Sequence, residues 1–335
     1  MDARAKPAHD TEFVERITIT MEMRQLGRSD LHIAPLVLGG NVFGWNVDEA
    51  TSFKLLDAFV GAGFNAIDTA DSYSRWVPDH KGGESETVIG NWLKSSGKRA
   101  QVVIATKIGS DMGQGRTVKK DYVLRAAEAC LKRLRVDCID LLQTHFDDTV
   151  TPVEETLAAY ALLIAQGKVR AIGASNITPE RLRASLAASQ RLGLPRYESL
   201  QPLYNLYDRA DFESQYAPIC EREGLGVITY YSLAAGFLTG KYRSAADVGK
   251  SAARGGRVQR YLDTRGLAIL KALDAVAARH AATPAQIALA WLIARPGITA
   301  PIASATSLQQ LTDIMRAPSI GLTPQDMAAL EAASG

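Results

Sequence analysis

Short apolar segments alternate with longer amphipathic segments along the chain, from about residue 36 to residue 315. The short segments are nearly continuous apolar runs, which is typical of parallel strands that are covered on both faces. We predict these strands at Leu36–Gly40, Asn65–Ala70, Val102–Gly109, Cys138–Phe146, Val169–Asn176, Tyr197–Pro202, Leu225–Ser232 and Ala300–Ala305.

The longer segments repeat apolar residues at helical spacing, and several carry helix start or stop signals. Proline follows threonine at Thr151 and again at Thr178, and acidic residues stand in the first helical turn after each pair. Gly167 and Gly193 stand where two helices are expected to end. We predict helices at Asp48–Ala62, Ser85–Ser95, Lys120–Leu134, Pro152–Gln166, Pro179–Arg191, Asp211–Glu223 and Leu267–Ile293, the last broken in two near Thr283.

This alternation of strands and helices predicts an α/β fold, a (β/α)8 TIM barrel in a single domain spanning residues 23–335. Met23–Ile33 is expected to form a short β-hairpin that closes the barrel floor. Residues 1–22 contain charges but no apolar region, so we predict a flexible leader rather than a secretory signal. The connection Gly240–Arg260 is expected to be an irregular loop.

The composition argues against several classes of protein. The chain has 335 residues with 38 Lys and Arg against 36 Asp and Glu, so nothing in its charge favours a nucleic-acid or membrane partner. Its three cysteines form no CxxC pair, which argues against a disulfide framework and a structural zinc site, and we predict no metal. No apolar run is long enough to span a bilayer. We expect a cytoplasmic protein, and leave open whether it forms a homo-oligomer.

Polar residues stand at the carboxyl ends of several predicted strands, where a parallel barrel builds its active site. Asp68, Lys107 and His145 each end an apolar run, and Tyr73 follows Asp68 by five residues. Further polar strand ends are Ser175, Asn176, Gln201, Tyr231 and Ser232. A single residue of this kind is commonly a cap or a surface charge. An acid, a cation, an imidazole and a phenol on one rim favour a catalytic site instead.

A series of segments, in order over most of the chain from about Met23 to Leu330, resembles the aldo-keto reductases. The segments are IDTADSY (67–73), GGESETVIG (82–90), IATK (104–107), IDLLQTH (139–145), GKVRAIGASN (167–176), LQPLYN (200–205), FLTGKY (237–242) and ALAWL with APIASAT (288–306). The resemblance is closer to the bacterial and potassium-channel β-subunit branch than to the mammalian hydroxysteroid and aldose reductases. It implies an oxidoreductase acting on CH–OH donors, which reversibly reduces aldehydes and ketones to alcohols with NADPH, with NADH as the alternative cofactor.

The resemblance implies a catalytic tetrad of Asp68, Tyr73, Lys107 and His145. Hydride addition to a carbonyl creates an alkoxide, so a proton donor must meet the oxygen as charge develops. A free phenol, with a pKa of about 10, is a weak acid near neutral pH. We expect Lys107 to lower the pKa of Tyr73, and Asp68 to keep Lys107 charged and oriented. His145 can donate a hydrogen bond to the carbonyl oxygen or relay a proton.

The resemblance also implies the cofactor contacts. Ser175, Asn176 and Gln201 would hydrogen-bond the nicotinamide carboxamide, and Tyr231 would stack on the ring. The other implied contacts are Gly39, Gly40, Asn41 and Asp68 on the nicotinamide side, Ser232, Leu233, Gly236, Leu238, Gly240 and Lys241 along the pyrophosphate and ribose, and Ser304, Thr306 and Gln310 at the adenosine end. No GxGxxG follows the first predicted strand, so a Rossmann domain is not supported.

The chain departs from the family pattern near the end of the last barrel strand. Many relatives carry a basic residue and an asparagine there, and the segment Ser304–Ile314 has neither. Recognition of the 2′-phosphate of NADPH would then fall to the basic loop, with Lys241, Lys250, Arg254 and Arg257 as candidates. The alternative is that this loop is basic only because it is solvated.

Four aromatic residues lie just beyond strand ends and are candidates for the wall of the substrate pocket: Phe43, Trp45, Trp76 and Phe146. Such a wall would suit a planar or apolar carbonyl compound as the small-molecule substrate. The alternative for Trp45 and Trp76 is that they only pack the loops.

Two other functions fit the same barrel. The first is a cofactor-sensing regulatory subunit with little turnover, which the resemblance to the channel β-subunit branch implies. The second is an aldolase or isomerase that uses Lys107 as a Schiff-base nucleophile. Such a lysine needs surroundings that favour its neutral form, and an adjacent Asp68 would favour the charged form.

Overall fold

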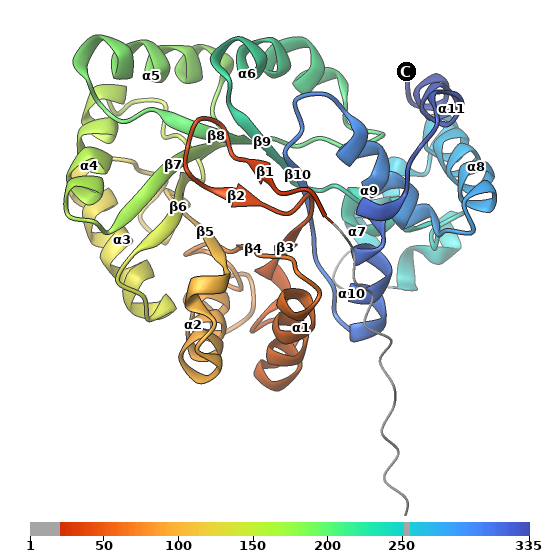
Figure 1. Cartoon of the computed structure of the whole chain (residues 1–335), viewed down its shortest axis with the longest axis horizontal. Helices are drawn as coiled ribbons and strands as arrows, with labels where there is room; N and C mark the ends of the chain where they lie inside the picture. Colours follow the sequence, from red (N-terminus) through yellow and green to blue (C-terminus); the bar gives the residue numbers. More distant parts are fainter. Residues whose placement is uncertain (1–20, 251–254) are drawn as a thin grey trace, which may run out of the picture.

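Parallel strands close into a barrel, and helices surround it (Figure 1). The structure, a computed structural model, describes residues 21–250 and 255–335. Around the barrel the strands run in the order β10 (Ala300–Ala303), β3 (Val37–Gly39), β4 (Ala66–Asp68), β5 (Val103–Ile108), β6 (Ile139–Thr144), β7 (Val169–Ser175), β8 (Tyr197–Gln201) and β9 (Gly226–Thr229). This order confirms the predicted (β/α)8 barrel. All but the last two residues of the predicted leader, 1–22, lie outside the described residues.

Helices lie on the outside of the barrel, those up to α9 between successive strands and the last two after β10 (Figure 1). They are α1 (Glu49–Gly61), α2 (Glu84–Ser96), α3 (Lys120–Leu134), α4 (Val153–Ala165), α5 (Pro179–Leu192), α6 (Ala217–Glu223), α7 (Gly255–Val258), α8 (Thr264–Arg279), α9 (Pro284–Ala294), α10 (Leu308–Met315) and α11 (Pro324–Ser334). The predicted break near Thr283 is confirmed, because Thr283 caps α9 in a capping box with Gln286. Helices α8 and α11 lie side by side outside the ring.

The structure differs from the predicted helices in three places. The segment 211–223 is not a single α-helix: it begins with a π-helical turn at Phe212–Tyr216, because Pro218 has no N–H to continue the α-helical hydrogen bonds. The connection Gly240–Arg260 is not irregular throughout, since it holds a 3-10 segment at Ala245–Lys250 and then α7. The helices α10 and α11 were not predicted.

A hairpin lies across one end of the barrel and is built from β1 (Arg24–Gln25) and β2 (His32–Ile33) (Figure 1). Its apolar residues Leu26, Leu31 and Ile33 are buried against the inward-facing residues of the barrel strands. Those inward-facing residues are Val37, Ala66, Ala105, Leu141, Ala171, Ile228 and Ala300. We call this set the lower layer. It is the small hydrophobic core inside the barrel, and the hairpin closes it off as the sequence predicted.

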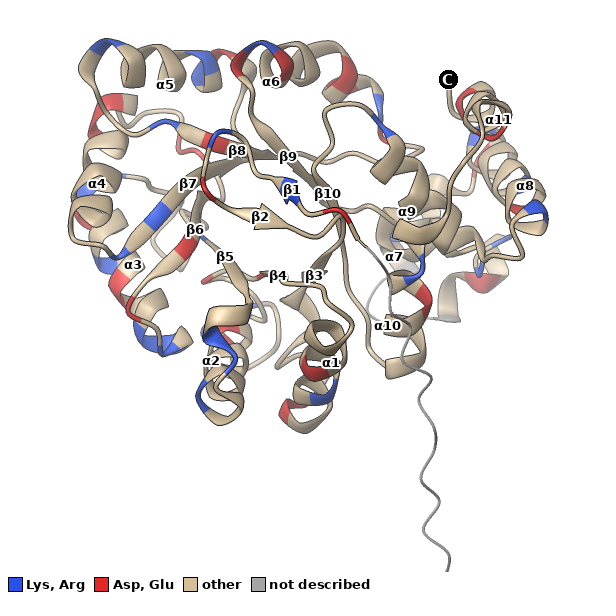
Figure 2. Cartoon of the chain, viewed as in Figure 1, with Lys and Arg blue, Asp and Glu red and all other residues tan. Residues whose placement is uncertain are grey.

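The outer helices carry charged residues of both signs. Figure 2 shows Lys and Arg interspersed with Asp and Glu over these helices. Of the helices formed by the described residues, none combines the length and the apolar character needed to cross a membrane.

Candidate active site

The inward-facing positions of the barrel change from apolar to polar within two residues along the strands. Ala66 is followed by Asp68 on β4, and Leu141 is followed by Gln143 on β6. Because side chains on one face of a strand recur every second residue, these pairs point to the same side of the sheet. The polar set at the carboxyl ends is Asp68, Lys107, Gln143, Ser175 and Gln201, and we call it the upper layer.

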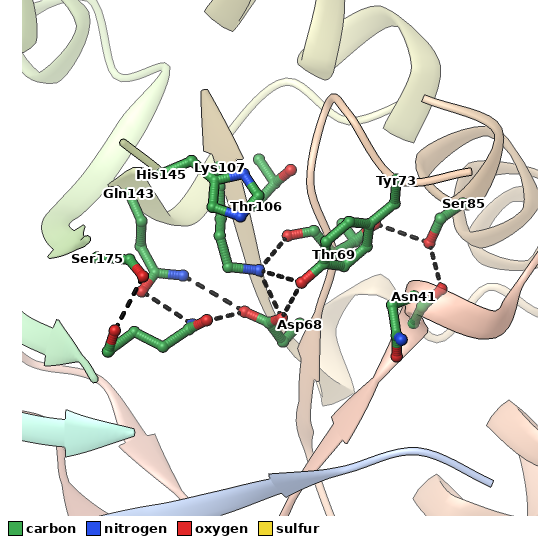
Figure 3. A network of polar contacts seen from close by, with 12 residues as sticks. Asn41, Asp68, Thr69, Tyr73, Ser85, Thr106, Lys107, Gln143, His145 and Ser175 are labelled. Carbon is green, nitrogen blue, oxygen red and sulfur yellow. Dashed lines mark hydrogen bonds and ion pairs between the residues drawn. The ribbon is translucent and has the colours of Figure 1, made fainter. Parts of the chain in front are cut away.

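Lys107 is at the centre of the upper layer and is 0% exposed. Its Nζ lies 2.6 Å from Oδ2 of Asp68, 2.8 Å from the carbonyl oxygen of Thr69 and 2.8 Å from Oη of Tyr73 (Figure 3). These three contacts use the three protons of an ammonium group. The site therefore favours a charged lysine that supports Tyr73, rather than the neutral amine that a Schiff-base mechanism needs.

The Asp68 carboxylate divides its two oxygens between two sets of donors. Oδ2 accepts hydrogen bonds from Lys107 and, at 3.3 Å, from the hydroxyl of Tyr73. Oδ1 accepts from Nε2 of Gln201 at 2.9 Å and from Nε2 of Gln143 at 3.4 Å. One carboxylate therefore links the phenol and lysine to the amides on β6 and β8.

The electrostatics of Tyr73 differ from the expectation that Lys107 lowers its pKa. Burial raises the pKa of the Tyr73 phenol well above its ordinary value, and the Asp68 carboxylate raises it further. Burial also lowers the pKa of Lys107, and Asp68 opposes that change. The expectation was wrong because burial of the phenol, together with the nearby negative charge of Asp68, outweighs the effect of the Lys107 ammonium on the pKa of Tyr73.

His145 lies beside Tyr73, with the two ring centroids 6.0 Å apart and the rings nearly perpendicular. Burial lowers the pKa of His145 well below its ordinary value, and the positive charges of Lys107 and Arg116 lower it further. The imidazole is therefore neutral near pH 7. A neutral ring carries one N–H, which makes it a hydrogen-bond donor to an oxygen in the site.

A cavity of about 770 Å³ opens above the upper layer, which is within the range of small-molecule and cofactor sites. Three tetrad residues line it, namely Asp68, Tyr73 and His145, while Lys107 lies beneath. The other sequence-predicted residues that line it are Gly39, Asn41, Ser175, Asn176, Gln201, Tyr231, Ser232, Leu233, Gly236, Ser304, Trp45, Trp76 and Phe146. Trp45 and Trp76 contact each other edge to face at 5.4 Å, so they pack together and also face the cavity.

The cavity has features that fit a nicotinamide dinucleotide. Tyr231 presents a ring that is 38% exposed, which leaves a face for stacking. After it, Ala234, Ala235 and Gly236 all have positive φ. The N–H groups of Ala234 and Gly236 donate to the carbonyl oxygens of Tyr231 and Leu233, so these residues form a tight turn at the edge of the cavity. A Cβ on Gly236 would meet nothing closer than 3.7 Å, so its glycine is explained by its φ of +93° and not by crowding.

The structure places several predicted site residues away from the cavity. Phe43 and Leu238 are fully buried in the core between barrel and helices, because their side chains turn away from the rim. Gly40, Gly240, Lys241, Thr306 and Gln310 do not line the cavity either. Gln310 accepts hydrogen bonds from the backbone N–H and hydroxyl of Thr306. Arg254 and the side chain of Lys250 lie outside the described residues.

The cavity also has lining residues that the sequence analysis did not select. They are Ser72, Arg75, Ser110, Asp111, Tyr230, Ala235, Ile302 and Ala303. Arg257, a candidate for the 2′-phosphate, also lines the cavity. Nη1 of Arg257 donates to the hydroxyl of Tyr231 at 2.7 Å. Gln143 was also missed, although its position two residues before His145 puts it on the inward face of β6. That spacing is the signal that could have identified it.

Comparisons with known proteins agree with this geometry. The family model described as "Aldo/keto reductase family" matches residues 35–334. The chain is 33% identical to "Uncharacterized oxidoreductase YrpG" of Bacillus subtilis (strain 168) over 310 residues, which is 90% of this chain and 92% of that protein.

Two further relatives are similar over nearly their whole length. One is "Probable voltage-gated potassium channel subunit beta" of Oryza sativa subsp. japonica, 31% identical over 93% of this chain and 96% of that protein. The other is "Protein tas" of Escherichia coli (strain K12), 31% identical over 93% and 97%. The chain therefore belongs to the aldo/keto reductase family and is an oxidoreductase acting on carbonyl compounds with a nicotinamide cofactor.

Proposed function

We propose that this protein reduces aldehydes and ketones to alcohols with NADPH, and that Tyr73 is the general acid. The observation that carries the proposal is the contact of the Tyr73 hydroxyl with Nζ of Lys107 at 2.8 Å, on the wall of a cavity that His145 also lines. Bound NADPH would supply the hydride to the carbonyl carbon. The chain's own residues then have to stabilise the carbonyl oxygen and give it a proton.

Tyr73 holds its proton firmly until the carbonyl oxygen gains negative charge. The raised pKa of the phenol keeps it protonated at neutral pH. An alkoxide is a stronger base than a phenolate, so the proton moves from Oη to the new alkoxide oxygen. The adjacent ammonium of Lys107 stabilises the phenolate that is left, and Asp68 holds that ammonium in place. General acid catalysis of this kind contributes roughly 10² to 10⁴ in rate.

The preference for NADPH over NADH rests on the basic loop. Arg257 lies at the cavity, while Lys241 follows the positive-φ segment and its Nζ lies 5.0 Å from the ring centroid of Tyr242. Their cations suit a 2′-phosphate, and Lys250 and Arg254 stay candidates from the sequence alone. We expect Arg257→Ala and Lys241→Ala to lower the ratio of kcat/KM for NADPH to that for NADH. Equal kcat/KM for the two cofactors in the unmodified protein would contradict the preference.

The aromatic wall supports a planar or apolar carbonyl substrate. Trp45, Trp76 and Phe146 line the same cavity as Tyr73. The guanidinium of Arg116 lies over the ring of Phe146, with 4.1 Å between the guanidinium carbon and the ring centroid, and this contact restrains the Phe146 side of the wall. An apolar wall discriminates weakly, by about 1–3 kcal/mol per methylene. We therefore expect several related aldehydes to be accepted.

The test is NADPH oxidation with a panel of aldehydes, ketones and sugars that includes 4-nitrobenzaldehyde. Tyr73→Phe removes the acid and leaves the cofactor contacts, so it should abolish turnover and leave the Kd for NADPH within about twofold. If Tyr73→Phe keeps near-native turnover, Tyr73 is not the acid.

A second candidate function is a regulatory subunit that senses the cofactor. It is favoured by the similarity to the rice protein named as a potassium channel β subunit. Such a protein would bind NADPH tightly but release product slowly. Sustained turnover of 4-nitrobenzaldehyde over many cycles would favour the enzyme, whereas a single burst followed by negligible turnover would favour the sensor.

A further inference from the structure

Three loops at the barrel rim bring two serine hydroxyls to one nitrogen of His145. Ser110 follows β5, Ser72 follows β4 and His145 follows β6. Oγ of Ser110 lies 2.9 Å from Nδ1 of His145, and Oγ of Ser72 lies 3.4 Å from the same nitrogen. Ser72 also donates to Oγ of Ser110 at 3.1 Å. The three groups form a short chain of hydrogen bonds.

The backbone around this chain is fixed. The N–H of His145 donates to the carbonyl oxygen of Ile108 at 2.7 Å, and its carbonyl oxygen accepts from Nδ2 of Asn176 at 2.8 Å. Gly109 has a φ of +101°, and a Cβ there would lie 2.9 Å from the carbonyl oxygen of Phe146. Only glycine lets the chain turn at this point and bring Ser110 beside the imidazole.

We propose that Ser110 and Ser72 are positioning residues that fix the tautomer of His145, so that Nδ1 accepts a hydrogen bond and Nε2 carries the proton. The inference deepens the proposed function, because it assigns the N–H that His145 presents to the substrate. Because Ser72 donates to Ser110, the hydroxyl proton of Ser110 is left for Nδ1, 2.9 Å away. When Ser110 donates to Nδ1, a neutral imidazole has its single proton on Nε2.

This arrangement matters for the reaction because only an N–H can stabilise a carbonyl oxygen that gains negative charge. In the opposite tautomer the proton is on Nδ1 and Nε2 carries a lone pair. That lone pair, on the side of the ring away from Ser110, would repel the carbonyl oxygen of the substrate. The charged groups that act on the ring are the ammonium of Lys107 and the guanidinium of Arg116, and the neutral phenol of Tyr73 faces it edge to face. Both cations disfavour a second proton on the ring, so the imidazole is neutral. The hydrogen bonds of the two serines then determine which of the two neutral tautomers is more stable.

The tautomer can be measured on the full-length protein labelled with 15N-histidine, without substrate. The His145 signals are assigned by their loss in His145→Gln. We expect the unmodified protein to show an unprotonated Nδ1 and a protonated Nε2 at pH 7, and Ser110→Ala to show a mixture of tautomers. A protonated Nδ1 in the unmodified protein, or an unchanged tautomer in Ser110→Ala, would overturn the proposal.

Kinetics supply a second readout with a matched control. Ser110→Ala should lower kcat about tenfold while the Kd for NADPH stays unchanged, because one hydrogen bond that aligns a transition-state donor is lost. Ser110→Thr keeps the hydroxyl and should recover most of the activity. Ser74→Ala is the control, since Ser74 is buried in the same loop as Ser72 but donates to the carbonyl oxygen of Phe43 and does not contact His145.

The outcomes separate this inference from the proposed function. An equal loss of kcat in Ser74→Ala and Ser110→Ala would mean that the serines only stabilise the loops, and the inference would fail. If Ser110→Ala does not fold, the tautomer of the unmodified protein and the activity of Ser72→Ala decide the question in the same way. Full activity of Tyr73→Phe would instead remove the proposed acid and leave the tautomer measurement standing.

Discussion

The two layers inside the barrel are built on the same strands but do different work. The lower layer consists of apolar side chains that pack against one another and against the hairpin that closes it. The upper layer begins two residues further along β4, β5 and β6 and four residues further along β7, and it consists of a charged pair, two amides and a serine that hydrogen-bond to one another and to the strand backbone. The residues that stabilise the barrel and the residues that carry its chemistry are therefore separated along the barrel axis, although on β4, β5 and β6 they are only two residues, about 7 Å, apart.

The largest expected effect is on the upper layer. Lys107→Met should lower kcat by roughly 10² to 10⁴, because the phenolate loses the cation that stabilises it. It should also destabilise the fold by about 3–5 kcal/mol, since it leaves the buried carboxylate of Asp68 without its ion-pair partner. Steady-state kinetics and urea unfolding would measure the two effects.

The double variant Asp68→Asn with Lys107→Met separates these two effects. It removes both charges, so it should recover most of the lost stability and none of the activity. Recovery of activity in the double variant would mean that the cation is not needed by Tyr73.

The matching change in the lower layer is Leu141→Ala. Leu141 is fully buried two residues before Gln143 on β6, so the substitution leaves a cavity and should cost about 2–5 kcal/mol of unfolding free energy. We expect kcat of the folded variant to stay within about twofold. A fall of more than tenfold in kcat, measured where the variant is fully folded, would show that the two layers are coupled.

A pH-dependent effect is expected behind the upper layer, at Asp71. Burial raises the pKa of this carboxyl to about 7, with Glu86 nearby adding to the change. Its Oδ1 is buried and has no hydrogen-bond partner among the described residues. Because the folded-state pKa is above the unfolded one, the stability that Asp71 contributes is complete below pH 4 and is lost as the pH rises through 7.

Asp71→Asn should remove this loss. The variant should gain stability relative to the unmodified protein between pH 4 and pH 8, by on the order of 4 kcal/mol for a shift of about three pKa units. Urea unfolding at a series of pH values measures the difference. A difference that does not change with pH would mean that Asp71 stays ionised in the folded protein.

The smallest expected effect is in the hairpin below the lower layer. Nη1 of Arg24 donates to the carbonyl oxygens of Ile293, Ile298 and Thr299, which ties β1 to the segment before β10. Arg24→Ala should cost about 1–2 kcal/mol of stability and leave kcat unchanged. Arg24→Lys is the matched control, because it keeps the charge but cannot reach three carbonyls with one planar group. Equal stability of the two variants and the unmodified protein would contradict a role for these contacts.

Much of the fold could be predicted from the sequence. The bounds of each barrel strand were predicted within a few residues, because buried parallel strands appear in the sequence as short and nearly continuous apolar runs. The helices α10 and α11 were missed since their apolar faces are short. The π-helical turn before α6 was not predicted, because a proline in the first turn of a helix is usually favourable. Here the helical turn already begins before Pro218, so the missing N–H of the proline interrupts its hydrogen bonds.

The site was predictable to the extent that its residues end strands. Asp68, Tyr73, Lys107 and His145 come together as predicted, because carboxyl ends of parallel strands meet on one rim. Phe43 and Leu238 were predicted at the cavity, but their side chains turn into the core. The spacing of apolar residues does not show in which direction a side chain points when it lies in a loop. Ser110 was missed because a serine after a glycine is a common turn, and only the three-dimensional approach of His145 gives it a role.

The division of the Asp68 oxygens has a consequence for protein engineering. Because a single carboxylate is shared by four donors, a substitution at Gln143 or Gln201 would change the orientation of the group that Lys107 depends on. Libraries aimed at new substrates should therefore keep both glutamines and diversify Trp45, Trp76 and Phe146, which border the cavity without contacting that carboxylate.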